Sequence, residues 1–161
     1  MDSDYQQKLD GWLKGDEVAK SFVLTLFSCL HTCDDLTDGD INVPIEQVHR
    51  AFWKMLIELP RNPFYAKHFT LLNGALQVAF LNWEIANKLE VSEEANAKAV
   101  AFVLRDSYAD LVTLCAWILG GEEWARQVGY ESRLDAAREG ITSYAHNLTG
   151  EHRRTTLTGG S

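Results

Sequence analysis

Apolar residues recur at intervals of three and four positions along almost the whole chain, and strict alternation of apolar and polar residues is nearly absent. This spacing gathers apolar side chains on one face of an α-helix, whereas a half-buried strand requires alternation. Between residues 17 and 36 the apolar positions are Val18, Phe22, Val23, Leu26, Phe27 and Leu30. The pattern predicts an all-α fold.

Glycine, proline and polar clusters divide this pattern into six or seven helices. We expect helices over 4–14, 17–36, 44–59 and 64–90, one from the Ser92 cap to Gly120, and two more over 122–129 and 132–147. A chain of 161 residues is long enough for one core and too short for two ordinary domains. We therefore expect a single-domain bundle over residues 1–149 and a flexible C-terminal tail over 150–161.

The charge balance excludes some classes of partner. Lys and Arg number 15 against 23 Asp and Glu, which gives a net charge of −8. This charge repels phosphate backbones, so we expect no nucleic-acid partner. The N-terminus lacks the basic and apolar regions of a signal peptide, and no apolar run reaches membrane-spanning length. The three cysteines lie in apolar stretches, which favours reduced core thiols. We expect a cytoplasmic protein with no membrane partner.

One acidic stretch conflicts with the helix that precedes it. "HTCDDLTDGD", residues 31–40, follows an apolar run directly. On a helix, His31, Asp35 and Asp38 extend the core-facing stripe. Like charges one turn apart, close to a helix C-terminus, destabilise a helix by about 0.2–0.5 kcal/mol per pair. A divalent cation would convert this repulsion into coordination, and the alternative is an ordinary turn into solvent.

The predicted helix that ends at Gly120 contains a second acidic pair. Asp106 and Asp110 interrupt a largely apolar face at a spacing of one helical turn. Buried carboxylates cost several kcal/mol unless they are paired or bound to a metal. Arg105 and Lys88 are the cationic partners that we identify on these helices. A cation site shared by the acidic helices would remove the cost.

The predicted helix over 64–90 adds polar residues to this hypothesis. Asn73, Gln77 and Glu84 fall on one line within an apolar surround. Each feature also has a structural interpretation: Glu84 can form a surface pair with Lys88, and His31 can be an ordinary boundary histidine. A single Glu-x-x-His, residues 46–49, is half of the pattern that carboxylate-bridged di-iron bundles use.

Two family resemblances suggest an activity. "DDLTD", residues 34–38, resembles the first aspartate-rich motif of the isoprenoid synthase families, and Asp106-x-x-x-Asp110 is similar to the second acidic helix of the squalene and phytoene synthase branch. This resemblance implies an all-helical enzyme whose acidic helices face each other and bind magnesium ions that hold a substrate diphosphate.

The second resemblance is to the all-helical nucleotide pyrophosphatases, which bind magnesium through acidic pairs on neighbouring helices. Here Asp35-x-x-Asp38 and Glu84-x-x-Asn87 are similar to their acidic signature. Both resemblances imply the same chemistry, in which magnesium neutralises charge on a diphosphate or on attacking water.

Two hypotheses from different classes follow. The first is a magnesium-dependent enzyme acting on a diphosphate-containing small molecule. Its metal ligands would be Asp35, Asp38, Asp106 and Asp110, its catalytic residues Glu84 and His31, and its substrate contacts Arg105, Asn73 and Gln77. The second is a non-catalytic, acidic helical interaction protein that binds or inhibits a partner. In either case a chain this small and rich in aromatic residues could complete its site or core as a homodimer.

Overall fold

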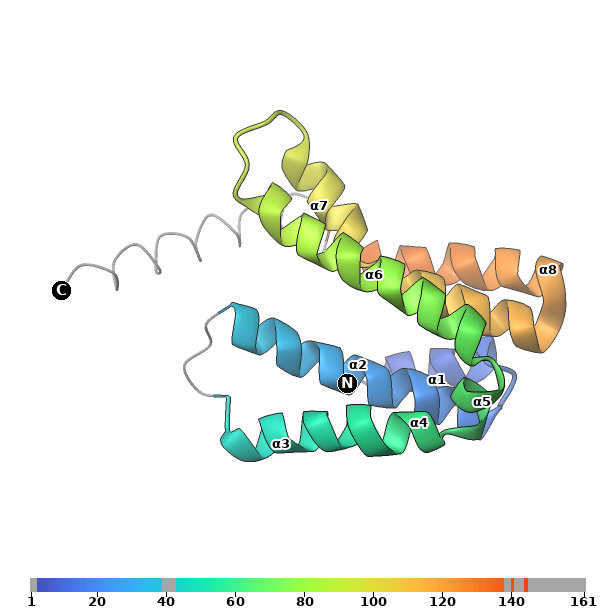
Figure 1. Ribbon diagram of the computed structural model, residues 1–161. Helices are drawn as coiled ribbons and strands as arrows, with labels where there is room; N and C mark the ends of the chain where they lie inside the picture. Colours follow the sequence, from blue (N-terminus) through green and yellow to red (C-terminus); the bar gives the residue numbers. More distant parts are fainter. Residues whose placement is uncertain (1–2, 39–42, 138–139, 141–143, 145–161) are drawn as a thin grey trace. The chain divides into compact units, whose positions relative to one another are not determined.

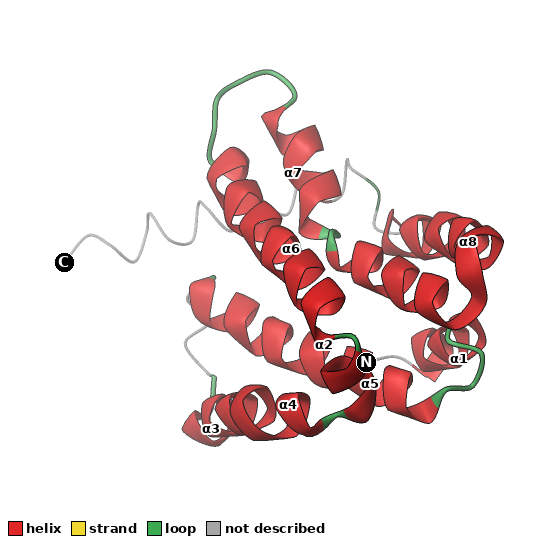
Figure 2. Ribbon diagram, turned by 45° about the vertical axis from the view of Figure 1, so that its right-hand side comes forward, coloured by secondary structure: helices red, strands yellow, loops and turns green. Residues whose placement is uncertain are grey.

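The computed structural model describes residues 3–38, 43–137, 140 and 144. Throughout these residues every regular element is a helix, and no strand occurs (Figure 2). The predicted all-α fold is thus confirmed. The longer helices are α1 (Ser3–Trp12), α2 (Glu17–Thr37), α3 (Ile45–Trp53), α6 (Phe69–Glu90), α7 (Ala97–Arg105) and α8 (Tyr108–Ala136). The shorter ones are the π-helix η1 (Lys54–Glu58), α4 (Leu59–Arg61) and α5 (Pro63–Lys67).

The chain divides into two compact units, with the boundary inside α6. One unit is Met1–Leu72 with Ile118–Gly120, and the other is Asn73–Trp117 with Gly121–Ser161. A single domain over residues 1–149 stays a prediction, and the predicted tail from residue 150 lies outside the described residues. No helix among the described residues is long and apolar enough to cross a bilayer.

The core of the first unit is built on α2. The Asp16 carboxylate caps this helix, as the sequence predicts, because it accepts hydrogen bonds from the N–H groups of Val18 (3.0 Å) and Ala19 (2.9 Å). Phe22 is fully buried and stacks on Tyr65 of α5, with ring centroids 5.2 Å apart. Phe22, Val23 and Leu26 of the predicted core face of α2 are buried, whereas Val18 is 40% exposed.

The helix predicted over 44–59 is a continuous run of α3, η1 and α4 (Figure 1), and η1 in its middle is a π-helix. The N–H of Leu59 donates to the carbonyl of Lys54, five residues earlier. Pro60 follows directly; it has no N–H, and in a regular α-helix its ring would clash with the carbonyl four residues before it. We attribute the π turn to this proline.

The helix predicted over 64–90 is two helices, α5 and α6. His68 leaves helical geometry between them, with φ −111° and ψ 21°. The cap predicted at Ser92 is also wrong, because α7 begins at Ala97 after Asn96, whose φ is +68°. The Ser92 hydroxyl instead accepts a hydrogen bond from the N–H of Glu94 (3.2 Å), which closes a local turn.

In the second unit, α8 folds back on itself at Gly121 (Figure 1). This residue has φ 80° and ψ −170°, so the break predicted at the Gly120–Gly121 pair is confirmed. The break predicted around Gly129 is wrong. A side chain at this glycine would meet Thr113 Cγ2 at 3.1 Å, so Gly129 permits close packing of the two arms of α8 and does not end a helix.

The cysteines match the sequence prediction of reduced thiols. Cys29, Cys33 and Cys115 are free, and the first and last are buried. Burial raises the pKa of the Cys115 thiol to about 12, so this thiol is protonated and unreactive at neutral pH.

The turn at Gly121 should be sensitive to any side chain. Gly121→Ala forces an L-residue into a backbone region that glycine alone adopts readily, and we expect it to lower the free energy of unfolding by about 1–3 kcal/mol. Gly74→Ala is the matched control, because Gly74 is helical with open space around its Cβ position, and it should stabilise by about 0.5–1 kcal/mol. Equilibrium urea unfolding measures both changes. Equal effects of the two substitutions would contradict this role for Gly121.

Candidate functional site

The acidic end of α2 lies against α3. The Gln47 side chain donates hydrogen bonds to the Thr32 hydroxyl (3.2 Å) and to Asp35 Oδ2 (3.3 Å). The other Asp35 oxygen lies 3.9 Å from Nε2 of His31. Asp38 forms the C-cap of α2, and both Asp38 and His31 are exposed, so the prediction that they extend the core-facing stripe is wrong.

Further along, the contacts between α2 and α3–η1 are also polar. The Lys54 ammonium donates to the Ser28 hydroxyl at 2.8 Å. The Cys29 thiol donates to the carbonyl of Ala51 at 3.5 Å. α3–η1 thus makes several hydrogen bonds to α2, and its half-buried residues also include the apolar Val48, Ala51 and Ile57.

The opposite side of this helical run is apolar and exposed. No residue of α3 is buried. The exposed fractions are 58% for Ile45, 61% for Phe52, 57% for Trp53, 39% for Met55 and 67% for Leu56. We call these five residues the α3 face. Their burial by a partner would remove a large apolar area from water.

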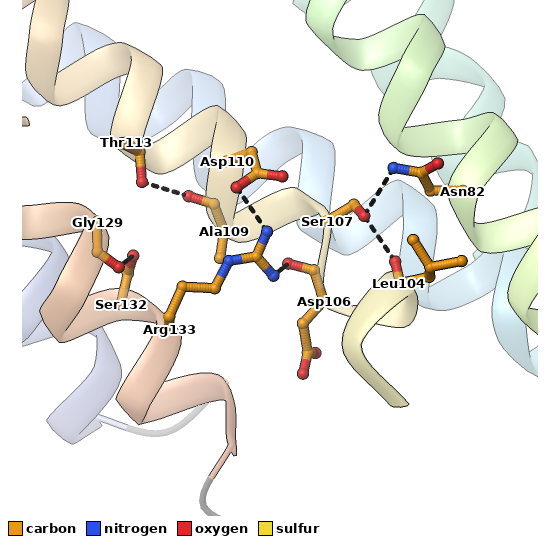
Figure 3. A network of polar contacts seen from close by, with 10 residues as sticks. All are labelled: Asn82, Leu104, Asp106, Ser107, Ala109, Asp110, Thr113, Gly129, Ser132 and Arg133. Atoms are coloured by element: carbon orange, nitrogen blue, oxygen red, sulfur yellow. Dashed lines mark hydrogen bonds and ion pairs between the residues drawn. The ribbon is translucent and has the colours of Figure 1, made fainter. Parts of the chain in front are cut away.

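The second acidic pair does not lie on one continuous helix, which corrects the sequence prediction. Asp106 ends α7 with φ −87° and ψ 17°. The buried Ser107 hydroxyl donates to the carbonyl of Leu104 (2.7 Å) and accepts from the Asn82 amide (3.0 Å) (Figure 3). Because a side-chain hydroxyl occupies this carbonyl, the helix breaks here and restarts as α8.

Arg133 is the functional group that the sequence analysis missed. Its guanidinium donates to Asp110 Oδ1 (2.5 Å) and to the carbonyl of Asp106 (2.9 Å) (Figure 3). The Asp110 side chain is 62% exposed, so it is not the buried carboxylate that the sequence predicts. Asp110 and Arg133 lie at nearly equal distances along the chain before and after Gly121. A helix that reverses at Gly121 brings two such residues together, and this symmetry is the feature of the sequence that indicates the pair.

Arg105 belongs to a buried network. Its guanidinium donates to Glu90 Oε1 at 2.6 Å, and the Tyr144 hydroxyl donates to the same oxygen. Burial and the Glu90 carboxylate together raise the pKa of Tyr144. The Tyr144 ring also packs on Phe102, with centroids 5.3 Å apart. Arg105 therefore compensates the charge of Glu90, and its predicted phosphate contact stays a prediction.

The remaining predicted site residues lie on α6. Asn73, Gln77 and Glu84 are exposed and share one face of this helix. Their predicted roles in substrate binding and catalysis stay predictions.

The proposed ligand aspartates fall in different units: Asp35 and Asp38 in the first, and Asp106 and Asp110 in the second. Their convergence on one site stays a prediction. In the part of the chain that the structure describes, no three His, Cys, Asp or Glu side chains are grouped so that they could hold a metal ion.

No protein-family model, curated protein or solved structure matches this chain.

Removing the Arg133 guanidinium should destabilise the second unit. Arg133→Met deletes the bonds to Asp110 and to the Asp106 carbonyl, and we expect it to lower the free energy of unfolding by about 1 kcal/mol. Arg126→Met is the control, since Arg126 pairs with Glu122 and Glu123 on an exposed surface and should change stability by less than about 0.5 kcal/mol. Thermal unfolding followed by circular dichroism compares them, and equal losses would refute the bridging role.

Proposed function

We propose that this protein is a non-catalytic helical interaction protein that binds a protein partner through the α3 face. The observation that carries the proposal is the orientation of α3–η1, which turns its hydrogen-bonding side to α2 and its apolar side to solvent. A helix selected only for the stability of its own fold would bury the apolar side. The reverse orientation is typical of a recognition surface.

The composition of the α3 face suits a protein contact. Aromatic residues and methionine are enriched in the cores of protein interfaces, and Phe52, Trp53 and Met55 provide them here. Fully burying a side chain such as Phe or Leu contributes about 1.5–3 kcal/mol. A few such residues side by side are enough to dominate a binding energy.

The acidic residues of the second unit support the same proposal. A magnesium site was inferred from carboxylates that lacked cationic partners in a core environment. Asp110 has such a partner in Arg133, and its side chain is largely exposed. Because the ion pair compensates this charge, no metal is needed to explain its position.

Polar substitutions on the α3 face should leave the fold intact. We expect Phe52→Ser combined with Leu56→Ser to change the free energy of unfolding by less than about 0.5 kcal/mol, because both side chains are exposed. The same two substitutions should reduce the fluorescence of a dye that binds exposed apolar surfaces. The control pair Tyr130→Ser with Leu134→Ser removes exposed apolar groups from α8. Strong destabilisation by the first pair alone would mean that the α3 face is part of the core.

Photo-crosslinking tests partner binding directly. A photoreactive phenylalanine analogue replaces Phe52 in the full chain, expressed in the cells that make the protein, and a second chain carries it at Tyr130. The proposal predicts a discrete protein adduct from position 52, which Leu56→Ser weakens, and none from position 130. Failure to form a specific adduct at position 52 would contradict it.

A magnesium-dependent, diphosphate-processing enzyme is the second candidate function. The observation in its favour is the end of α2, where Asp35 and Asp38 follow His31 on one helix. Under this proposal the protein is cytoplasmic, its substrate is a small molecule that contains a diphosphate, and magnesium is its cofactor.

Magnesium and pyrophosphate should then stabilise the protein. Ligand at a hundred times its dissociation constant adds about 2.7 kcal/mol to the free energy of unfolding. Thermal melts with and without both ligands would show an increased melting temperature for the wild type and for the control Glu93→Gln. Asp38→Asn and Asp106→Asn should each lose the increase. Identical responses of all four proteins would eliminate the shared site.

A further inference from the structure

We infer that the partner of the α3 face is a second copy of this chain, bound antiparallel through the same face. This inference rests on the proposed function, because it names the partner of that surface. It depends on the distribution of charge along the helical run from α3 to α4.

Charged residues of both signs alternate along this run. At the Ile45 end lie Glu46, in the first turn of α3, and the carboxylates Asp35 and Asp38 of α2, to which Gln47 connects the helix. The C-terminus of α2 adds the negative end of its helix dipole there. Further along the run lie Arg50 in the last turn of α3, Glu58 in η1 and Arg61 in α4, and all three are exposed.

A twofold axis makes this arrangement self-complementary. In an isologous dimer the same surface of each copy forms the contact, so residue i meets residue j and j meets i. When two copies of the run lie antiparallel, opposite charges of the two copies come together, because Arg50 of each lies opposite Glu58 of the other. If the axis passes close to Lys54, Phe52 of one copy lies opposite Leu56 of the other, and Glu46 lies opposite Arg61.

Other occupants fit the charge pattern less well. A helix that lies on an anionic bilayer carries an excess of Lys and Arg beside its apolar face, whereas the exposed Arg50 and Arg61 of this run are matched by Glu46 and Glu58. A parallel second copy would place like charges against each other, which is destabilising. The antiparallel copy pairs both ends and buries both apolar faces.

Sedimentation equilibrium of the full chain tests the inference. The wild type should dimerise, and Phe52→Ser with Leu56→Ser should raise the dimer dissociation constant by about tenfold or more. The control pair Tyr130→Ser with Leu134→Ser should leave it unchanged. A wild type that remains monomeric at the highest measurable concentration overturns the inference, as does a dimer that the first pair does not weaken.

A charge exchange tests the antiparallel register independently of the apolar residues. Glu46→Arg and Arg61→Glu each place like charges together twice in a homodimer, so each variant alone should dimerise more weakly than the wild type. An equimolar mixture restores two attractive pairs in the heterodimer, and dimerisation should recover. The pair Glu93→Arg and Lys98→Glu, on the second unit, is the control and should have no effect. Absence of recovery in the mixture overturns the antiparallel arrangement.

These outcomes separate the inference from the proposed function. An adduct of two copies in the photo-crosslinking experiment at position 52 supports both. An adduct with a different protein, together with a monomeric wild type, leaves the proposed function intact and overturns the second-copy inference. The circular dichroism spectrum of each variant should match that of the wild type, since every substituted residue except Lys98 is exposed and Lys98 is half-buried.

Discussion

The polar contacts between α2 and α3–η1 determine which side of α3–η1 is exposed on the surface of the first unit. Gln47 and Lys54 project from α3–η1 towards α2, where they bond to Asp35, Thr32 and Ser28. Because these hydrogen bonds hold one side of α3–η1 against α2, the opposite side, which carries the α3 face, is turned to solvent. These hydrogen bonds, each worth about 0.5–1.5 kcal/mol net, hold the side of α3–η1 that carries Gln47 and Lys54 against α2.

In the second unit the backbone turn at Gly121 determines the polar contacts of Arg133. Gly121 reverses the direction of α8, and the two arms pack closely where Gly129 meets Thr113. This packing brings Arg133 back to Asp106 and Asp110, at the break between α7 and α8. The acidic residues that suggested a metal site in the sequence thus take part in holding the ends of three helical segments together.

Apolar periodicity was sufficient to predict much of the fold. Together with the capping and glycine signals it identified α2 almost to its ends, the Asp16 cap and the break at Gly120–Gly121, because each of these depends on neighbouring residues alone. It did not locate the break at Ser107, because a serine whose hydroxyl bonds to an earlier carbonyl can also lie inside a helix. It also misjudged Gly129, since a glycine that ends a helix and one that allows close packing look the same in a sequence.

The candidate site was less predictable than the fold, and for a physical reason. Periodicity shows that α3 has an apolar stripe, but the stripe is the same whether it faces a core or a partner. Only the contacts of the opposite side, from Gln47 and Lys54, reveal its direction. The Asp110–Arg133 pair is not evident from the sequence for a similar reason. The two residues are far apart along the chain, and only the turn at Gly121 brings them into contact.

Hydroxyl-radical footprinting of the intact protein tests the outward orientation of α3 most directly. It compares chemically identical side chains, so differences in oxidation rate report exposure. The account predicts rapid oxidation of Trp53 and Phe52, which are 57% and 61% exposed, and protection of Trp12 and Phe22, which are 5% and 0% exposed. The measurement is made at a protein concentration low enough to keep the chain monomeric. Protection of Trp53 and Phe52 under these conditions, at the level of Trp12 and Phe22, would contradict the claim that the α3 face is a surface for a partner.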